Sequence, residues 1–314
     1  MAFAVAPKVS SGITLCIFVL HGDNLKEMAV LQAYFETDVD EIGMRRFLHM
    51  ILNKTENLST AAGDAWHQSS GAEGFSSKRW LAYFQENKSS CPQIVIPEAV
   101  KVSQSIRPSL IRSLQRFQIG ETGEGKHLKK FASKMNDPVY EQCIDMFIKE
   151  EQHHARILAQ MIASMDGTLL TWHWSDLVFI ALRRLLHLKT EIFVLLIAEV
   201  IGKCFYRTCS AHLEDPLLSD AFSLIVLDEL GHLEFHCGFL RSQFETAPIF
   251  LRRCVLLCWS ALFFCASYVF IADHKAALTA LNVTPQQFLR DLSTSFRICS
   301  QRSLALEPKV EPKD

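Results

Sequence analysis

The sequence predicts an all-α protein with a four-helix bundle at its centre. Strand signals are nearly absent, and apolar residues recur with helical periodicity over long segments. Asp137-Pro138 and Asp215-Pro216 interrupt this periodicity, because proline removes a backbone donor and restricts the residue before it. The predicted bundle helices cover residues 105–134, 138–165, 175–211 and 217–244.

Additional helices are expected on both sides of the bundle. Before it, we expect an amphipathic helix near Leu25–Asn53, a polar loop over 59–77 and a short helix at Arg79–Asn87. After it, we expect one apolar helix to about Leu281 and another that begins at Thr284. The predicted organisation is a helical extension over 1–100, a four-helix bundle over 101–245, C-terminal apolar helices packed on the bundle over 246–302, and a disordered tail over 303–314.

Composition limits the classes of function. The chain has 314 residues, a net charge of -2 and no strongly basic run, so we expect no nucleic-acid partner. The ten cysteines include no Cys-x-x-Cys pair, which argues against a rubredoxin-like iron site or a zinc ribbon. Cys143 and Cys204 fall on predicted buried faces, and Cys254 and Cys258 are expected in the core. Free thiols of this kind fit a reducing cytoplasm, which is the expected location.

Two apolar segments bear on membrane contact. Ile13–Leu20 is short and has neither a basic start nor a clear cleavage site, so we expect a buried strand or the start of a helix rather than a signal peptide. Cys254–Ala272 contains nineteen uncharged residues, which is long enough to span a bilayer. We favour a fifth core helix over the metal bundle, and membrane contact through 254–272 is the less favoured alternative.

The most specific pattern in the chain occurs twice. A glutamate is followed thirty residues later by Glu-x-x-His, and the same arrangement returns with each element offset by 78 residues (199 − 121, 229 − 151 and 232 − 154). A glutamate and a histidine at i and i+3 lie on one helix face and can bind one metal ion. Such a ligand set, drawn from four helices, is typical of a bundle that holds two iron or manganese ions. The predicted ligands are Glu121, Glu151, His154, Glu199, Glu229 and His232.

Helix phase chooses between neighbouring candidates. Glu151 and His154 interrupt an apolar stripe, so they are expected to point inward. Glu150 and His153 have the same spacing but share their face with polar residues, so we expect them to be solvated. Buried charge requires a partner or a metal, and the inward pair is therefore the predicted ligand pair.

The positions of the two lone glutamates follow from their distances, in residues, to the Asp-Pro breaks. Glu121 and Glu199 each lie 16 residues before the Asp of an Asp-Pro break, and each following Glu-x-x-His begins 14 residues after that Asp. Because these distances are the same in both helix pairs, the glutamate side chains are expected at the same height along the bundle. Glu191 would lie ~12 Å too far along its helix, so it is rejected, while Glu124 falls on the same stripe as Glu121 and is the second choice.

Three further features complete the predicted site. Asp228 is expected either as an alternative ligand or as a residue beside the ligands. His236 is expected beside them, since it lies ~10 Å beyond Glu229 along the helix axis. The segment Gly120–Gly125 contains three glycines inside a predicted helix. Either the segment is a loop, which would weaken the case for Glu121, or small residues let a neighbouring helix or a substrate approach closely. We favour the second interpretation.

At these residues the chain resembles the ferritin-like di-iron carboxylate superfamily. Phe147–Leu158 is similar to the second-helix signature of acyl-carrier-protein desaturases and related oxygenases, and Asp228–His232 is similar to the fourth-helix Asp-Glu-x-x-His. Gly120–Gly123 is similar to the glutamate segment of membrane-associated quinone hydroxylases. The resemblance covers about 105–245. Aryl-amine N-oxygenases carry an extra histidine four residues before the fourth-helix glutamate, where this chain has Ile225.

The resemblance implies a ferritin-like four-helix bundle in which Glu121, Glu151 and His154 hold one ion and Glu199, Glu229 and His232 hold the other. Glu151 and Glu229 would be the bridging ligands. The expected cofactor is two iron ions, with manganese or a mixed pair as the alternative. The expected function is an O2-dependent di-iron oxidase or oxygenase for a small or lipid-like organic substrate, and its electron donor is unknown. The alternative is a ferritin-type ferroxidase or an iron-binding protein without an organic substrate.

Overall fold

The computed structural model describes residues 13–17, 31–35, 75–90, 94–173 and 188–306. The chain divides into two compact units, Met1–Lys54 and Thr55–Asp314. In the first unit, β1 (Ile13–Ile17) pairs antiparallel with β2 (Leu31–Phe35). The strand expected near residue 13 is confirmed, but the helix expected over 25–53 is wrong at residues 31–35. Aromatic and β-branched residues in the two strands favour pairing there.

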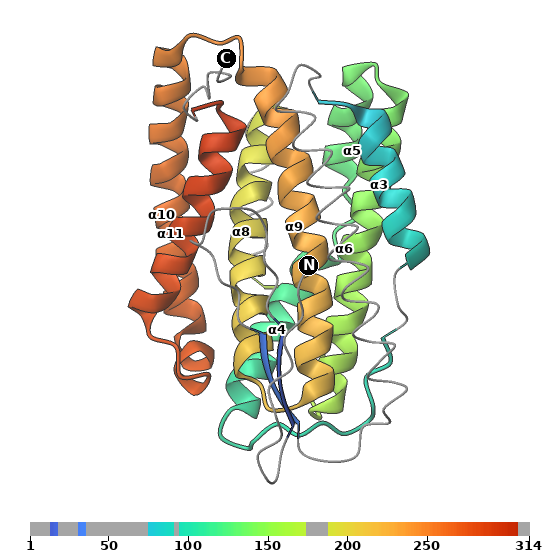
Figure 1. Cartoon of the computed structure of the whole chain (residues 1–314), viewed down its shortest axis with the longest axis vertical. Coiled ribbons are helices and arrows are strands. Elements are labelled where there is room, and N and C mark those ends of the chain that lie inside the picture. Colours follow the sequence, from blue (N-terminus) through green and yellow to red (C-terminus); the bar gives the residue numbers. More distant parts are fainter. Residues whose placement is uncertain (1–12, 18–30, 36–74, 91–93, 174–187, 307–314) are drawn as a thin grey trace. The chain divides into compact units, whose positions relative to one another are not determined.

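Every described regular element of the second unit is a helix, so the all-α prediction is confirmed for this unit (Figure 1). Most of the polar loop expected over 59–77, the expected helix start at Ser175 and the last residues of the expected tail lie outside the described residues. The helices are α3 (Ser77–Ser90), α4 (Arg107–Glu121), α5 (Lys126–Ala132), the 3-10 helix η2 (Ser133–Met135), α6 (Pro138–Ser164), α8 (Leu188–His212), α9 (Pro216–Phe244), α10 (Ile249–Ala280) and α11 (Pro285–Ser303).

The predicted breaks mark the starts of two helices that carry the site. The side chain of Asp137 accepts hydrogen bonds from the first-turn amides of Val139 and Tyr140 and so caps α6. Asp215 caps α9 in the same way through the amide of Leu218. In both cases proline occupies the first helical turn, where its missing N–H has no cost.

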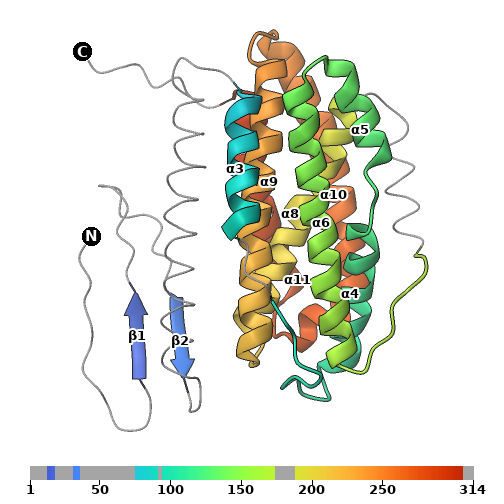
Figure 2. The ribbon, with the colours of Figure 1, turned by 90° about the vertical axis from the view of Figure 1, so that its right-hand side faces the viewer.

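The helices that carry the predicted ligands pack along their lengths. α4 packs against α6, α8 packs against α9, and α6 also contacts α9 (Figures 1 and 2). α3 lies on α6, while α11 packs on α8 and α9 and α10 packs on α11 and α4. A continuous apolar core runs between them and includes Leu114, Ile144, Leu158, Phe205 and Phe222.

The helix expected over 105–134 is interrupted, which corrects the favoured interpretation of the glycine segment. α4 ends at Glu121 and α5 begins at Lys126, with Gly125 in the left-handed region at φ 60°. Among the described residues, nothing lies within 4 Å of a Cβ placed at Gly120, but a Cβ at Gly125 would overlap Ile148 of α6. The glycines therefore end α4, and the close approach of a neighbouring helix occurs at Gly125. Glu121 nevertheless reaches the site because it occupies the last turn of α4.

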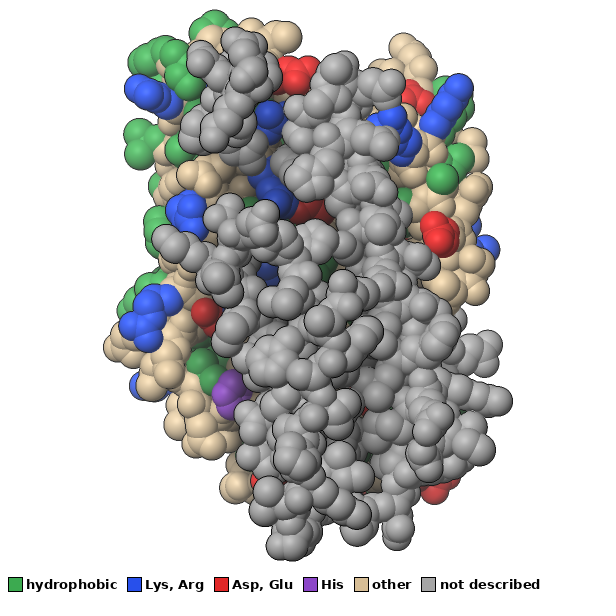
Figure 3. All heavy atoms as spheres, in the orientation of Figure 1, with side chains coloured by type: hydrophobic (Ala, Val, Ile, Leu, Met, Phe, Trp, Pro, Cys, Tyr) green, Lys and Arg blue, Asp and Glu red, His purple; other side chains and the backbone are tan. Residues whose placement is uncertain are grey.

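α10 is not the enclosed core helix that we favoured. It is long and apolar enough to cross a membrane, yet only 17% of its apolar 18-residue stretch is buried. One face contacts the protein through Trp259 and Phe263, while Phe250 and Tyr268 are each 76% exposed. Cys258, expected in the core, is exposed. In Figure 3 hydrophobic side chains line the edge where α10 lies in Figure 1.

Candidate metal centre

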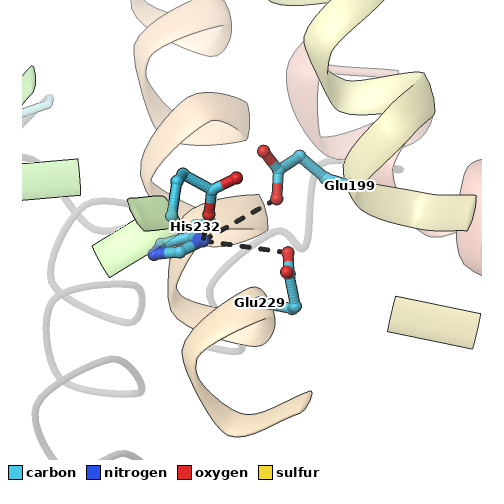
Figure 4. A group of neighbouring side chains, drawn as sticks. Glu199, Glu229 and His232 are labelled. Carbon is cyan, nitrogen blue, oxygen red and sulfur yellow. Dashed lines mark ion pairs between the residues drawn. The ribbon is translucent and has the colours of Figure 1, made fainter. Parts of the chain in front are cut away.

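All six predicted ligands come together between the helices of the second unit. They form two groups whose potential donor atoms lie within 4.8 Å of one another. Glu151, Glu199, Glu229 and His232 make one group, and Glu121, Glu151 and His154 make the other. Figure 4 shows Glu199, Glu229 and His232 directed toward one point. The six side chains therefore lie at the same height along the helices, as the helix phases and the equal distances from the Asp-Pro breaks predicted.

Two glutamates connect the groups. Glu151 belongs to both, and its Oε1 lies 3.1 Å from His232 Nδ1 and 3.6 Å from His154 Nδ1. Glu229 directs one oxygen to each histidine: Oε1 is 3.6 Å from His154 Nδ1, and Oε2 is 3.7 Å from His232 Nδ1. Glu151 and Glu229 are therefore the two glutamates that approach both histidines.

The donor atoms fit a metal because, within the part of the chain that the structure describes, none of them makes a hydrogen bond of suitable geometry. Several buried atoms that face the centre have no hydrogen-bond partner, which is costly unless another ligand is present. These atoms are Glu151 Oε1, Glu199 Oε2, Glu229 Oε2, His154 Nδ1 and His232 Nδ1. Carboxylate oxygens and imidazole nitrogens are suitable ligands for iron and manganese.

The electrostatics of the glutamates also suit a bound cation. Burial raises the pKa of Glu121 well above its usual range, and the charge of Glu151 raises it further. Burial and the charge of Glu199 likewise raise the pKa of Glu229. Burial acts in the same direction on Glu199, but its polar contacts with Glu229 and His232 lower its pKa to about 2. Two divalent cations would balance the charge of four ionised glutamates.

Tyr206 holds the glutamate at the end of α4. Its hydroxyl donates to Glu121 Oε1 at 2.6 Å from a position that is fully buried in α8. The ring also packs on Phe117 of α4, with centroids 5.0 Å apart. This contact fixes a ligand whose own helix stops at the same residue. The sequence offered a signal for Tyr206, since it lies seven residues after Glu199 on the same helix face.

On the side away from the centre, each histidine contacts a carboxylate that precedes the other Glu-x-x-His motif. Glu150 Oε2 lies 2.9 Å from His232 Nε2, and Asp228 Oδ2 lies 3.2 Å from His154 Nε2. Asp228 therefore lies beside the ligands, the second of its two expected positions. The expectation that Glu150 is solvated is wrong, since its side chain is only 15% exposed. The cause is α3, which covers this polar face of α6.

The remaining candidates lie away from the cluster. Glu124, the second choice, is exposed and forms an ion pair with Lys126, so its role as an alternative ligand is not supported. His236 is buried edge-on to Phe147, and burial lowers its pKa to about 4. Neither His236 nor the rejected Glu191 belongs to either donor group.

Sequence analysis missed Asn87 altogether. This residue of α3 is 7% exposed and donates to Glu150 and Asp228, the two carboxylates behind the histidines. Its only sequence signal is its place at i+7 from Trp80 on the buried face of a short helix.

Comparisons of the chain with protein-family models, with curated proteins and with solved structures give no match.

Proposed function

We propose that the second unit is a ferritin-like four-helix bundle with a di-iron centre, and that the chain is an O2-dependent oxidase or oxygenase. The observation that carries this proposal is the pair of donor groups that share Glu151, with inward-facing atoms that lack protein partners. A storage bundle also binds iron. The helices outside the ligand set, however, give this chain more structure around the centre than a minimal ferroxidase bundle requires.

In this proposal Glu121, Glu151 and His154 would hold one ion, and Glu199, Glu229 and His232 would hold the other. When bound, the iron pair supplies redox chemistry that reduces O2 and oxidises a C–H or N–H bond of an organic substrate.

The protein contributes orientation, proton position and exclusion of water. Glu150 and Asp228 accept hydrogen bonds from the Nε2 atoms and so direct both Nδ1 atoms to the centre. The Tyr206 hydroxyl holds its proton in a hydrogen bond to Glu121 Oε1 and so fixes the orientation of this carboxylate. Phe147 packs edge-on against His232 with centroids 4.7 Å apart and keeps water from the ring.

A lipid-like substrate agrees with the exposed face of α10. We propose that this face contacts an anionic membrane. Leu257 and Tyr268 are 73% and 76% exposed on it, and its exposed charges are the cations Arg253 and Lys275. The only acid of α10, Asp273, is paired with Arg116 at 3.2 Å. Apolar surface between basic residues suits lipid chains below anionic headgroups.

Self-association through α10 is disfavoured by the same charges. A parallel pair of α10 helices would place Arg253 against Arg253 and Lys275 against Lys275. An antiparallel pair centred on Phe264 would place Arg253 opposite Lys275, since 264 is midway between 253 and 275. Like charges therefore meet in either orientation, whereas anionic headgroups neutralise them.

The enzymatic proposal is tested by iron and O2 stoichiometry. The protein is loaded anaerobically with Fe(II), exposed to O2, and then given successive portions of Fe(II). We expect one round of O2 consumption that ends when the bound pair is oxidised. Lys149→Ala, an exposed change on α6, should behave like the unaltered protein, and Glu151→Ala should show no reaction above free Fe(II). Repeated oxidation of each portion with accumulation of a ferric core would instead support a ferroxidase.

The membrane proposal is tested by co-sedimentation with vesicles. We expect binding to vesicles that contain phosphatidylserine and weaker binding to phosphatidylcholine alone. Leu257→Glu should reduce binding, while Leu217→Glu, an exposed change at the start of α9, should not. Equal binding by the two variants, or a concentration-dependent dimer that Leu257→Glu dissociates, would contradict it.

A further inference from the structure

The buried face of α3 brings one amide to the centre. Trp80, Tyr83, Phe84 and Asn87 are its buried side chains, spaced i, i+3, i+4 and i+7. Trp80 and Phe84 pack on Phe235 of α9, with ring centroids 5.4 and 5.2 Å apart. Aromatic packing thus fixes α3 in place, and Asn87 is the polar end of the face. A buried amide at this position requires hydrogen-bond partners.

The partners of Asn87 are the two carboxylates that hold the histidines. Its Nδ2 donates to Glu150 Oε1 at 2.8 Å and to Asp228 Oδ1 at 3.0 Å. The other oxygen of each carboxylate faces a histidine Nε2, at 2.9 Å for His232 and 3.2 Å for His154. Glu150 and Asp228 are themselves offset by 78 residues (228 − 150), like the ligands that follow them. Asn87 therefore joins two equivalent chains of contacts.

One amide group suits this place because each of its two hydrogens serves one carboxylate. With one oxygen held by the amide, the other is directed to Nε2–H, and the lone pair of Nδ1 is left to face Glu151 and Glu229. Without the amide, two neighbouring buried carboxylates would repel each other and could rotate away from the rings.

We propose that Asn87 is a positioning residue that fixes the tautomer and orientation of both His154 and His232 and thereby governs metal binding at both half-sites. The part concerning metal rests on the proposed function. The tautomer part does not, because the contacts involve protein atoms alone. A side chain outside the four ligand helices would then control the whole centre.

The test uses Asn87→Leu, which removes both donors, and Asn87→Asp, which keeps the shape but replaces the donors with acceptors. The matched control is Gln85→Leu, an amide-to-leucine change on the exposed face of the same helix. In metal-free, histidine-labelled full-length protein, ¹⁵N shifts report the tautomer of each ring. We expect Nε2–H for both rings in the unaltered protein and in the control, and a mixture of tautomers in both Asn87 variants.

Metal affinity is measured in parallel by titration with Fe(II) under anaerobic conditions. Both Asn87 variants should bind each of two ions about 10–100-fold more weakly, a typical effect of losing an outer hydrogen bond at a metal site. Unchanged tautomers with unchanged affinity would overturn the inference, and so would weakening at one half-site alone. If the unaltered protein bound no metal while the tautomers still changed, the proposed function would fail and the positioning role of Asn87 would stand. If Asn87→Leu did not fold, Asn87→Asp would decide by the same measurements.

Discussion

At Gly231 the Tyr83 side chain of α3 lies against the backbone of α9, and Gly231→Ala tests whether this contact supports the centre. A Cβ at residue 231 would overlap the Tyr83 hydroxyl and lie 2.7 Å from Tyr83 Cζ. The ring has little room to move, since it packs edge-on against Trp80 and Phe84 with centroids 5.3 and 5.4 Å away. Overpacking of this kind costs about 1–3 kcal/mol, while alanine in a helix gains about 1 kcal/mol over glycine.

Gly238→Ala separates the two effects. The substitution gains the same helix propensity on α9, but among the described residues outside α9 the atom nearest to its Cβ would be Phe75 Cδ2 at 3.4 Å, an ordinary contact distance. In urea unfolding of the metal-free protein, Gly231→Ala should therefore be about 1–3 kcal/mol less stable than Gly238→Ala. It should also bind Fe(II) more weakly, because a shift of α3 moves Asn87, one turn beyond Tyr83. Equal stability and equal affinity of the two variants would refute the reasoning.

Four other substitutions give distinct outcomes. Tyr206→Phe removes the donor to Glu121, so binding should weaken about 10-fold at that half-site alone; equal weakening at both would argue against it. Glu151→Ala should abolish binding of both ions, while Glu124→Ala should leave both in place, and similar metal contents would show that the helix phase is wrong. Asp220→Asn should stabilise the protein at pH 7, because burial and then Asp215 raise the pKa of Asp220 to about 6. Its ionisation opposes folding as pH rises from about 4 to 6, so urea unfolding should show no gain near pH 3.

The sequence predicted the ligand cluster because its determinants are local and repeated. Helix phase distinguished Glu151 from Glu150, and the equal distances from the Asp-Pro breaks placed Glu121 and Glu199 at one level. These inferences need only the geometry of a helix and the position of its start.

The surroundings of the cluster could not be predicted in the same way, because they depend on packing between distant segments. Glu150 has a polar face in the sequence, and only the docking of α3 buries it. Asn87 has no motif of its own and gains a role 63 residues away in sequence from Glu150. The exposed face of α10 was mistaken for core, since an apolar helix has the same composition whether protein or lipid covers it. The end of α4 could not be predicted either, because the glycines of 120–125 could have ended the helix or stayed within it as small residues.

Metal content with the geometry of the bound ions tests the central claim most directly. The full chain is reconstituted anaerobically with Fe(II), freed of excess metal, and measured by elemental analysis and X-ray absorption. We predict two ions per chain, each with one histidine nitrogen and several carboxylate oxygens, and a second metal near each absorber. One ion or none per chain, with the six ligands intact, would contradict the account.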